Sequence, residues 1–390
     1  MRGQRALLTA RGHTVDTFTR SSAEISGAIV SKAGAFFSGI YSRGARREFS
    51  RALRDARPDV VHVHNLFPLI SPSILPECRA AGVPVVMTLH NFRLVCPNAL
   101  LFTRGRVCRE CLGGREWRCV LNNCEAGVGK SSGYALRTWA ARHFRRVLDN
   151  VDVFICLTEF QRQIYIKEGF PADRCVVITN FVGEDSDNLH RKGAKCAELR
   201  TENSPLRPPR LCGEDSPFFV LYVGRVSPEK DVPTLLEAAK LCPDIPFKIA
   251  GSYWRMPDLP RRAPANVRFL DHVSAGSVHE LYAQARLVVF ATRCYEAFPA
   301  VLPEAMSHAR PLVCARIGGL PEIVTDGGNG LLYTPGDAAD LAGKIRRLWG
   351  DPAMCAALGG NGRDRALTDY GPDRHYERLM AAYARAGAAP

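Results

Sequence analysis

The amino-acid sequence predicts an α/β protein with two domains, each built around a parallel β-sheet. Its 390 residues exceed what a single hydrophobic core usually supports, so we expect two cores. Short apolar strands alternate with helical segments through most of the chain, which is typical of parallel sheets with right-handed crossovers. Hydrophobic residues make up 46% and charged residues 23% of the chain, a composition that indicates a globular protein.

The first domain is predicted at residues 1–182. Its strands are expected in short apolar or alternating runs at residues 14–19, 58–64, 83–90, 151–157 and 176–180. Helical segments are expected at residues 1–10, 26–56, 71–81, 133–148 and 159–168. A loop at residues 91–130 interrupts this alternation and carries a cluster of cysteines.

The second domain is predicted at residues 218–372, after a polar segment at residues 183–217. That segment has few large apolar residues, so we expect a mobile linker or insertion that forms no core of its own. Strands are expected at residues 218–224, 247–250, 267–270, 287–290, 311–314 and 330–333, and helices at 338–349 and 374–386. The C-terminal helix, within residues 373–390, is expected to pack back on the first domain.

Two carboxylates, Glu296 and Glu304, mark a candidate binding site. A predicted strand at residues 287–290 precedes them, and Pro303 marks the first turn of a predicted helix. Open α/β sheets bind ligands at the carboxyl edge of their strands, where these carboxylates can accept hydrogen bonds from sugar hydroxyls. The alternative is an ordinary surface loop with two solvated acids.

Two cations form a second candidate site, directly after the first strand of the second domain. Arg225 and Lys230 lie five positions apart, and a predicted helix follows from Pro233. An arginine fork and a lysine point charge can together offset the charge of a diphosphate. The alternative is a charged turn on the surface.

Together these motifs resemble the donor domain of glycosyltransferase family 4. Their order is Gly-Arg-x4-Lys, Glu-x-Phe-x5-Glu-Ala-Met, Gly-Gly-Leu-Pro-Glu-Ile-Val and Asn-Gly-Leu-Leu-Tyr. The strands that end at His64 and His90 resemble the family's acceptor domain, so the resemblance covers almost the whole chain. It implies the GT-B architecture, in which two doubly wound, Rossmann-like domains face each other across a cleft. It also implies retaining transfer from a nucleotide-diphosphate sugar, with no cofactor or metal required for catalysis.

The resemblance implies roles for individual residues. Arg225 and Lys230 match the pair that stabilises the leaving diphosphate as negative charge builds on it. Glu304 matches the residue that hydrogen-bonds the ribose. Glu296, near the donor sugar, and His90, at the acceptor side of the cleft, are the predicted catalytic residues. Backbone N–H contacts to the donor are expected from Phe298, Ala300 and Val301.

The same resemblance implies a mechanism and shows departures. The family is usually explained by a front-face mechanism in which the departing phosphate takes the acceptor proton. Glu296 is therefore not assigned as a nucleophile, unlike one of the paired carboxylates of retaining glycosidases. Pro299 and Ala309 stand where the family commonly has glycine. The family's first strand and Gly-rich loop have no counterpart before Met1, so we expect these 390 residues to be N-terminally incomplete.

Five cysteines in the loop at 91–130 form the pattern C-x11-C-x2-C-x7-C-x4-C, beginning at Cys96. A C-x2-C pair followed by two more cysteines is a zinc-binding pattern. The four ligands would be Cys108, Cys111, Cys119 and Cys124, holding a structural zinc. The alternative is a set of buried or redox-active thiols.

Positive charge is concentrated in the first half of the chain. Residues 1–180 carry 26 lysines and arginines against 14 acidic residues, a net charge of +12, whereas the remainder carries +1. This predicts a polyanionic partner, either an anionic membrane surface or nucleic acid. The helix at residues 134–148 sets aromatic residues beside arginines, which suits a membrane interface. The alternative for this helix is a core-facing apolar side with a solvated basic side.

Three functional classes follow. The first is a glycosyltransferase acting on an unknown sugar or lipid-linked acceptor, in cell-surface polysaccharide or glycolipid synthesis. The second is a catalytically inactive relative. The third, a zinc-containing nucleic-acid-binding protein, leaves the run from Glu296 to Glu322 unexplained, so no nucleic acid is expected. With no apolar run long enough for a transmembrane helix or a signal peptide, we expect a cytoplasmic protein, associated with the inner face of the membrane if that helix binds lipid.

Overall fold

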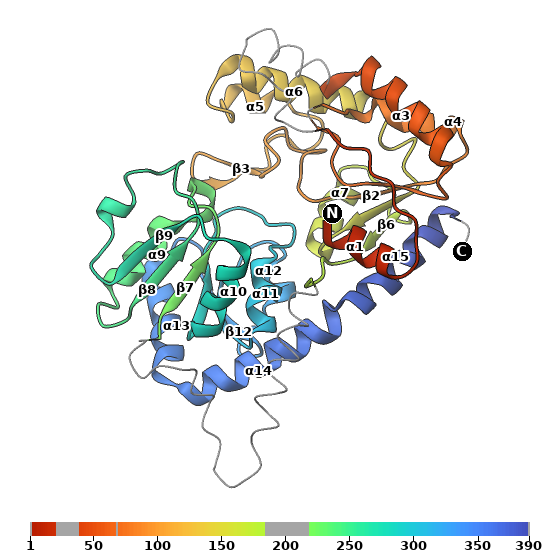
Figure 1. Ribbon diagram of the computed structural model, residues 1–390. Coiled ribbons are helices and arrows are strands. Elements are labelled where there is room, and N and C mark those ends of the chain that lie inside the picture. Colours follow the sequence, from red (N-terminus) through yellow and green to blue (C-terminus); the bar gives the residue numbers. More distant parts are fainter. Residues whose placement is uncertain (1, 21–38, 68, 184–217, 389–390) are drawn as a thin grey trace. The chain divides into compact units, whose positions relative to one another are not determined.

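The chain forms two compact units in the computed structural model, which describes residues 2–20, 39–67, 69–183 and 218–388 (Figure 1). Unit 1 consists of Met1–Thr179 together with His375–Pro390, and unit 2 of Asn180–Arg374. Among the described residues, no helix is both long and apolar enough to cross a membrane. The predicted linker at 183–217 and the first part of the predicted helix at 26–56 lie almost entirely outside the described residues.

The core of unit 1 is a four-stranded parallel sheet in the order β1-β2-β5-β6. These strands are β1 (Val61–Val63), β2 (Val85–Thr88), β5 (Val153–Cys156) and β6 (Cys175–Val177). The two central strands, β2 and β5, are buried along their whole length. A parallel strand covered on both faces needs a continuous apolar sequence, which explains the runs Val-Val-Met and Val-Phe-Ile.

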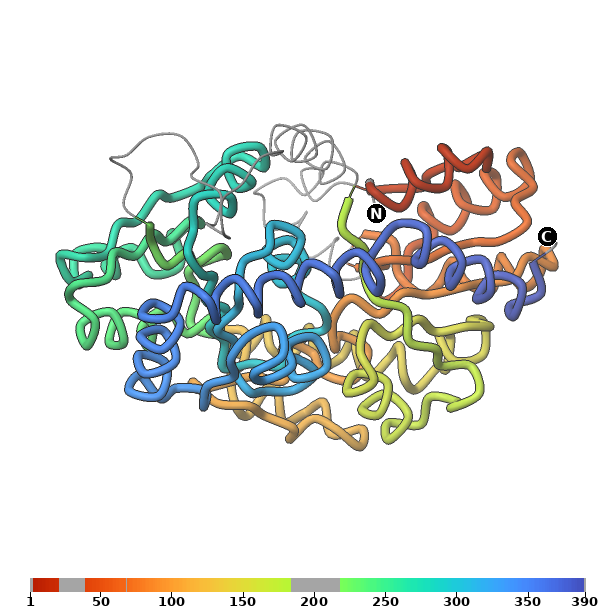
Figure 2. Tube along the Cα trace, turned by 90° about the horizontal axis from the view of Figure 1, so that it is seen from below, coloured from red at the N-terminus to blue at the C-terminus, as the bar shows by residue number. Residues whose placement is uncertain are grey.

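The helices of unit 1 include elements from early and late in the sequence. They are α1 (Arg2–Ala10), α3 (Arg43–Ala56), η2 (Pro72–Ile74), α4 (Leu75–Ala80), α5 (Arg118–Leu121), α6 (Val128–His143), α7 (Glu159–Lys167) and α15 (Pro372–Ala386). Helices α1 and α15 lie side by side in Figures 1 and 2. Leu8 of α1 and Leu379 of α15 belong to one buried cluster with Val86 and Val153 of the central strands. The C-terminal helix is therefore part of the core of unit 1.

Unit 2 contains a six-stranded parallel sheet in the order β12-β11-β10-β7-β8-β9. The strands are β7 (Val220–Val223), β8 (Phe247–Ala250), β9 (Val267–Asp271), β10 (Leu287–Phe290), β11 (Leu312–Ala315) and β12 (Gly330–Tyr333). The chain runs outward from β7 to β9, then returns to the other side of β7 with β10. This reversal makes the carboxyl ends of β7 and β10 a topological switch point, where doubly wound sheets bind ligands.

The remaining elements of unit 2 surround this sheet (Figure 1). They are η4 (Pro228–Lys230), α9 (Val232–Lys240), η5 (Pro260–Arg262), α10 (Ala275–Gln284), α11 (Val301–Ser307), α12 (Leu320–Ile323), α13 (Ala338–Gly350) and α14 (Pro352–Asp369). The loop after β7 leads into η4, and the loop after β10 leads into α11. Both loops leave the sheet at the switch point, so they determine what can bind there.

Some local predictions were wrong. Residues 14–19 form no strand, although they alternate in polarity. Their apolar side chains pack individually, with Phe18 edge-on to Phe49 at 5.3 Å between ring centroids, so the segment is held by side chains rather than by a strand ladder. The short hairpin of β3 (Phe102–Thr103) with β4 (Arg106–Val107) and the glycine-containing helix α14 were not predicted.

Candidate functional site

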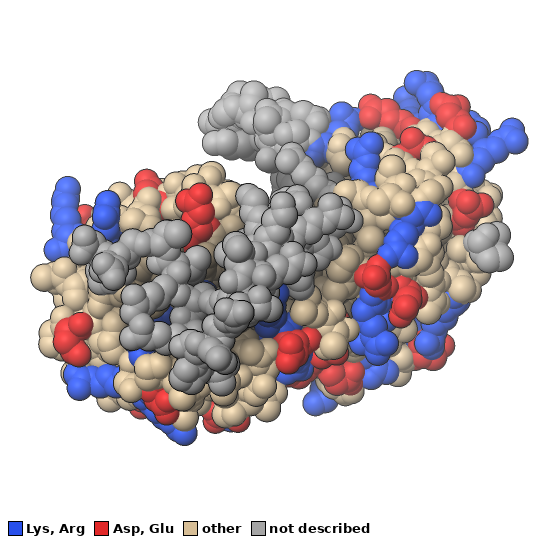
Figure 3. Space-filling view, turned by 60° about the horizontal axis from the view of Figure 1, so that its bottom comes forward, with Lys and Arg blue, Asp and Glu red and all other residues tan. Residues whose placement is uncertain are grey.

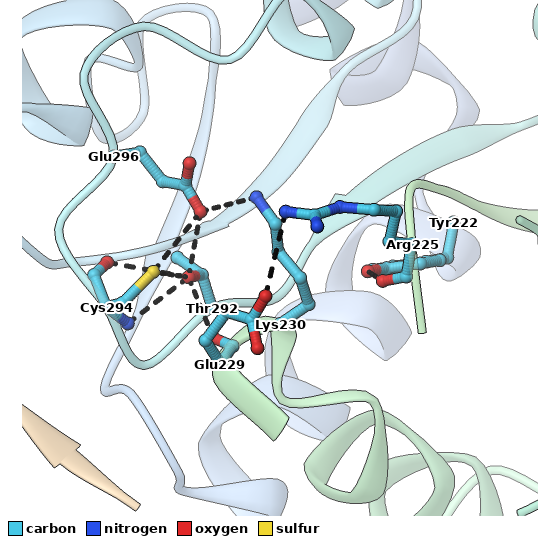
Figure 4. Close-up of polar contacts among 7 residues, drawn as sticks. All are labelled: Tyr222, Arg225, Glu229, Lys230, Thr292, Cys294 and Glu296. Atoms are coloured by element: carbon cyan, nitrogen blue, oxygen red, sulfur yellow. Dashed lines mark hydrogen bonds and ion pairs between the residues drawn. The ribbon is translucent and has the colours of Figure 1, made fainter. Parts of the chain in front are cut away.

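The switch point of unit 2 brings Lys230 and Glu296 together (Figure 4). Lys230 ends η4, after β7, and Glu296 lies in the loop after β10. The ammonium Nζ of Lys230 donates to Glu296 Oε1 at 2.5 Å, and the side chains are only 15% and 16% exposed. The hydroxyl of Thr292 and the thiol of Cys294 lie 3.2 and 3.5 Å from the same carboxylate oxygen. The pair is thus held in a fixed position at the edge of the sheet.

Arg225 lies in the loop that leads to Lys230, but its side chain is more exposed and more loosely paired. Its side chain is 58% exposed and approaches the buried Glu229 only to 3.7 Å. Its backbone is fixed, because the buried hydroxyl of Tyr222 donates to the Arg225 carbonyl at 3.0 Å. An anchored backbone with an exposed guanidinium leaves the side chain able to reach an incoming anion.

Two glycines allow this loop to turn away from the sheet. Gly224 has a φ of +151° and Gly251, at the end of β8, a φ of +154°, both unfavourable for other residues. A Cβ added to Gly251 would lie 1.8 Å from the Gly224 carbonyl oxygen. Gly251 was not singled out from the sequence, although a glycine directly after a strand is a signal of close backbone approach.

An ion pair between the buried Asp231 and the partly exposed Arg293 joins the two loops behind Lys230. Asp231 pairs with the Nε of Arg293 at 2.9 Å and accepts a hydrogen bond from the Thr234 hydroxyl at 2.8 Å. The backbone N–H of Arg293 also donates to the Glu229 carbonyl at 2.9 Å. Burial raises the pKa of Asp231, while its hydrogen bond to Thr234 and its ion pair with Arg293 act in the opposite direction. These contacts connect the Lys230 loop to the Glu296 loop.

Glu304 lies on α11 and is oriented by a buried tyrosine. The hydroxyl of Tyr282, on α10, donates to Glu304 Oε2 at 3.1 Å. Burial and the adjacent carboxylate raise the pKa of Tyr282, so the phenol stays protonated and remains a donor. Tyr282 was not predicted as a site residue; its sequence position in a helical pattern indicates only a core residue.

The expected backbone donors lie where α11 begins. Ala300 is the N-cap and Val301 the first residue of α11, so their N–H groups have no acceptor within the helix. Phe298 is buried, with its ring edge-on to Tyr370 at 5.3 Å. The described geometry is compatible with donor contacts from these three residues, whose roles remain predictions.

His90 belongs to unit 1 and lies shortly after β2. Its contact with His64 was not predicted from the sequence. Its Nε2 lies 2.9 Å from Nδ1 of His64, which follows β1. His64 in turn stacks on His62, with ring centroids 4.4 Å apart. Three histidines therefore share the carboxyl edge of this sheet.

Neutral hydrogen-bond partners surround His62. Its Nε2 lies 2.7 Å from the Thr88 hydroxyl and its Nδ1 2.8 Å from the hydroxyl of Tyr383, on α15. Burial lowers the pKa of His62 well below its usual value and lowers the pKa of His64 to about 3. Both rings are therefore uncharged at neutral pH, and a neutral His64 can either donate to His90 or accept from it.

The five clustered cysteines of unit 1 line one small cavity. All are free thiols. The hydrogen bond between Cys119 and Cys124 lowers the pKa of Cys124 to about 6 and raises that of Cys119. Within the described part of the chain, however, no three His, Cys, Asp or Glu side chains are placed so that they could hold a metal ion together. Zinc binding by Cys108, Cys111, Cys119 and Cys124 therefore stays a prediction.

Helix α6 does not have the expected solvated basic side. Arg137 is buried, whereas Leu136 and Trp139 are 46% and 43% exposed. The alternative given for this helix, an apolar side in the core and a basic side in solvent, was therefore wrong for these three residues. On the face shown in Figure 3, basic side chains of the described residues are interspersed with acidic ones, so the net charge is not gathered into a single patch there.

Comparison with known proteins shows the family. The family model "Glycosyltransferase Family 4" matches residues 5–185, and "Glycosyl transferases group 1" matches residues 212–365. The chain belongs to the family 4 glycosyltransferases. The predicted family and fold class are confirmed, since the two parallel-sheet units agree with the GT-B fold of two Rossmann-like domains.

Other glycosyltransferases are similar in sequence to this family 4 member. An O-antigen chain mannosyltransferase B from Escherichia coli is 28% identical over 211 residues, 51% of each chain. An alpha-D-kanosaminyltransferase from Streptomyces kanamyceticus is 27% identical over 259 residues, 64% of each chain. A glycogen synthase from Mycobacterium tuberculosis is 31% identical over 326 residues, covering 81% of this chain and 66% of the synthase. The chain thus matches about half to two thirds of the lengths of these relatives.

Solved structures share the fold at lower sequence identity. A glycosyltransferase from Rickettsia africae has a TM-score of 0.66 at 13% identity and covers 100% of this chain and 95% of its own. The Anabaena protein Alr3699/HepE in complex with UDP-glucose has a TM-score of 0.60 at 17% identity and covers 97% and 88%. At these identities the likeness concerns the fold alone.

Proposed function

We propose that this family 4 glycosyltransferase transfers a sugar from a nucleotide-diphosphate sugar to an acceptor hydroxyl, with retention of the anomeric configuration. The observation that carries the proposal is the arrangement at the switch point of unit 2. There Lys230 and Glu296 are fixed as a pair, Arg225 is free to reach an anion, and Tyr282 orients Glu304. The UDP and UDP-glucose complexes of the Anabaena protein support a nucleotide-diphosphate donor.

In the proposed reaction the acceptor oxygen bonds to the anomeric carbon as the bond from that carbon to the β-phosphate oxygen breaks. Arg225 and Lys230 offset the charge that builds on the leaving diphosphate. Glu304 accepts hydrogen bonds from the ribose, and Glu296 contacts the donor sugar. The departing phosphate takes the acceptor proton, so neither carboxylate forms a covalent bond to the sugar and no metal ion or cofactor takes part.

We also propose that unit 1 acts at an anionic membrane surface, in cell-surface polysaccharide or glycolipid synthesis. Large apolar side chains are exposed on α5, α6 and the residues around them: Trp117, Leu121, Val128, Leu136, Trp139 and Phe144. Arginines lie beside them, with Arg118 4.4 Å above the Trp117 ring and Arg146 4.9 Å above the Phe144 ring. Aromatic rings next to cations favour the interface of an anionic bilayer.

The first experiment is a thermal-shift panel of UDP-, GDP- and ADP-sugars, followed by product analysis with the sugar that binds. We expect one nucleotide series to raise the melting temperature, because a ligand that binds only the folded chain stabilises it. We then expect the product to keep the donor's anomeric configuration, as read by NMR coupling constants. Stabilisation without hydrolysis or transfer would favour the inactive relative, and an inverted product would refute retention.

A further inference from the structure

Arg137 of α6 is a buried arginine that has no ion-pair partner among the described residues. It is 6% exposed, and its Nε and Nη2 have no hydrogen-bond partner. No carboxylate of the described residues pairs with it within 4 Å. Its guanidinium instead lies against two aromatic rings, 4.6 Å from the centroid of Phe67 and 4.3 Å from that of Tyr134. Burial lowers the pKa of Arg137 to about 10, so it is still a cation at neutral pH.

Arg142, on the same helix, differs from Arg137 in having ion-pair partners within the protein. Its guanidinium pairs with two buried carboxylates, Glu168 at 2.5 Å and Glu116 at 3.6 Å. Buried charges are normally paired in this way, because an uncompensated charge loses its hydration and gains nothing in return. Arg137 has no such carboxylate among the residues that the structure describes, which leaves it able to pair with an anionic ligand.

A second arginine shares the Tyr134 ring with Arg137. The guanidinium of Arg93 lies 5.8 Å from the centroid of that ring, and Arg93 also forms no ion pair with a described residue. The positive charge of Arg93 contributes to the lowered pKa of Arg137, so the two cations repel each other. Lys130 lies 5.8 Å from the same ring but is already paired with Glu125 at 2.9 Å. Arg93 and Arg137 therefore remain beside one ring without an ion-pair partner among the described residues, although the charge of Glu125 partly favours the cation of Arg137.

These arginines border the carboxyl edge of the unit 1 sheet. Phe67 follows β1 three residues after His64, and Arg93 follows β2 three residues after His90. The His64–His90 pair marks the same edge, where parallel sheets bind ligands. Arg93 and the Phe67 ring that lies against Arg137 are thus on the loops that flank the predicted acceptor-side histidine.

We propose that Arg93 and Arg137 bind a phosphate or diphosphate group carried by the acceptor. This rests on the proposed function and assigns a chemical class to the acceptor. A phosphate monoester carries up to two negative charges and a diphosphate carries more, so either group can pair with both arginines. A carboxylate carries one negative charge and would leave one arginine unpaired. The Nε and Nη2 atoms of Arg137 are closed to solvent, so binding requires a neighbouring side chain to move, and the half-buried Phe67 ring, 4.6 Å from the guanidinium, is the candidate.

The test measures binding of inorganic pyrophosphate and of geranyl diphosphate to the full chain by calorimetry. In Arg93→Gln and in Arg137→Gln we expect affinity to fall about 10- to 100-fold, as for the loss of a charge-assisted contact. Arg145→Gln, an exposed arginine of the same region paired with Asp149, is the matched control and should bind as the parent does. Tighter binding of geranyl diphosphate than of pyrophosphate identifies a lipid-linked acceptor; equal binding identifies a soluble phosphorylated one.

Lys230→Ala separates this site from the donor site. If pyrophosphate binding is lost in Lys230→Ala and unchanged in both arginine variants, the anion binds at the donor site and the proposal is overturned. Nucleotide-sugar binding is measured in the same variants. If the parent binds diphosphate but no nucleotide-sugar, and Arg137→Gln loses the diphosphate binding, only the proposed function is refuted. Arg137→Met gives a second readout: removal of an unpaired buried charge should leave the melting temperature equal or higher, whereas a large decrease would indicate a structural arginine.

Discussion

Replacement of Lys230 by alanine tests the centre of the proposed donor site. Lys230 is 15% exposed and donates to Glu296 at 2.5 Å. A unit charge about 4 Å from a phosphate is worth about 4 kcal/mol at an effective dielectric constant of about 20. The negative charge of Glu296 offsets part of this interaction energy, so the net stabilisation of the leaving diphosphate by Lys230 is smaller. Loss of one preorganised charge contact costs about 2.7–4 kcal/mol of transition-state stabilisation, and we expect turnover to fall about 10²- to 10³-fold.

The fold should survive this change. Glu296 keeps its contacts with the Thr292 hydroxyl and the Cys294 thiol, and it is near enough to the surface to be hydrated. The free energy of unfolding should therefore fall by less than the about 3–5 kcal/mol that follows removal of one partner from a fully buried pair. Lys240→Ala is the control, since Lys240 pairs with Glu237 on the exposed side of α9 and such pairs are worth about 1 kcal/mol or less.

The measurements are steady-state transfer or donor hydrolysis, calorimetric binding of the nucleotide diphosphate, and urea unfolding of each variant. A Lys230→Ala chain that is folded and turns over donor at the parent rate would refute the role of Lys230. A parallel loss of activity in Lys240→Ala would show that the assay reports general damage rather than a contact at the site.

Four further outcomes are expected. Tyr282→Phe should weaken nucleotide binding about 5- to 10-fold by removing a hydrogen bond to Glu304, while Tyr253→Phe should have no effect; equal binding by Tyr282→Phe would contradict the orienting role. Gly251→Ala should lower the free energy of unfolding by about 1–3 kcal/mol, because its Cβ would meet the Gly224 carbonyl, whereas Gly276→Ala has open space around it and should be neutral or stabilising. Because burial lowers the pKa of His64 in the folded chain, the unfolded chain binds the proton first as the pH falls. The free energy of unfolding should therefore decrease below about pH 6.5, by up to about 1.4 kcal/mol per pH unit for this group. Urea unfolding between pH 6.5 and 5 should show a smaller decrease in His64→Gln than in the parent, and an equal decrease would contradict the assignment. The parent should co-sediment with anionic vesicles, and less of it should do so at high salt. Trp139→Ser should reduce co-sedimentation, whereas Trp254→Ser, an exposed tryptophan of unit 2, should not. Equal co-sedimentation with neutral vesicles would contradict an electrostatic contribution to membrane binding.

Most of the fold could be predicted because parallel strands covered on both faces have continuous apolar sequences. The strands at 247–250, 287–290 and 330–333 were predicted with the bounds that the structure gives. The segment at 14–19 was wrongly predicted as a strand. Alternation of polar and apolar residues indicates which side chains are buried, but it does not show whether a neighbouring strand is present to form hydrogen bonds. Helix α14 was missed because its glycines and asparagine weaken its local preference for a helix, and packing overrides that preference.

The candidate site was predicted as separate motifs, and the contacts between them were not. Lys230 and Glu296 are 66 positions apart, and only the order of β7 beside β10 brings them together. His64 was given no role because a lone histidine at the end of a strand is usually structural, and its contact with His90 depends on the pairing of β1 with β2. Arg137 was assigned to solvent because helical periodicity does not indicate which side of a mixed helix is covered.

The packing of α15 against α1 has a consequence for how the chain assembles. On the ribosome, α1 emerges long before α15, so Leu8 and Val86 stay uncovered until Leu379 and Tyr383 have been synthesised. Unit 2 has its whole sheet within one continuous stretch, so it can fold earlier in synthesis than unit 1. Loss of α15 would therefore damage the histidine-bearing unit first, because Tyr383 is also the partner of His62.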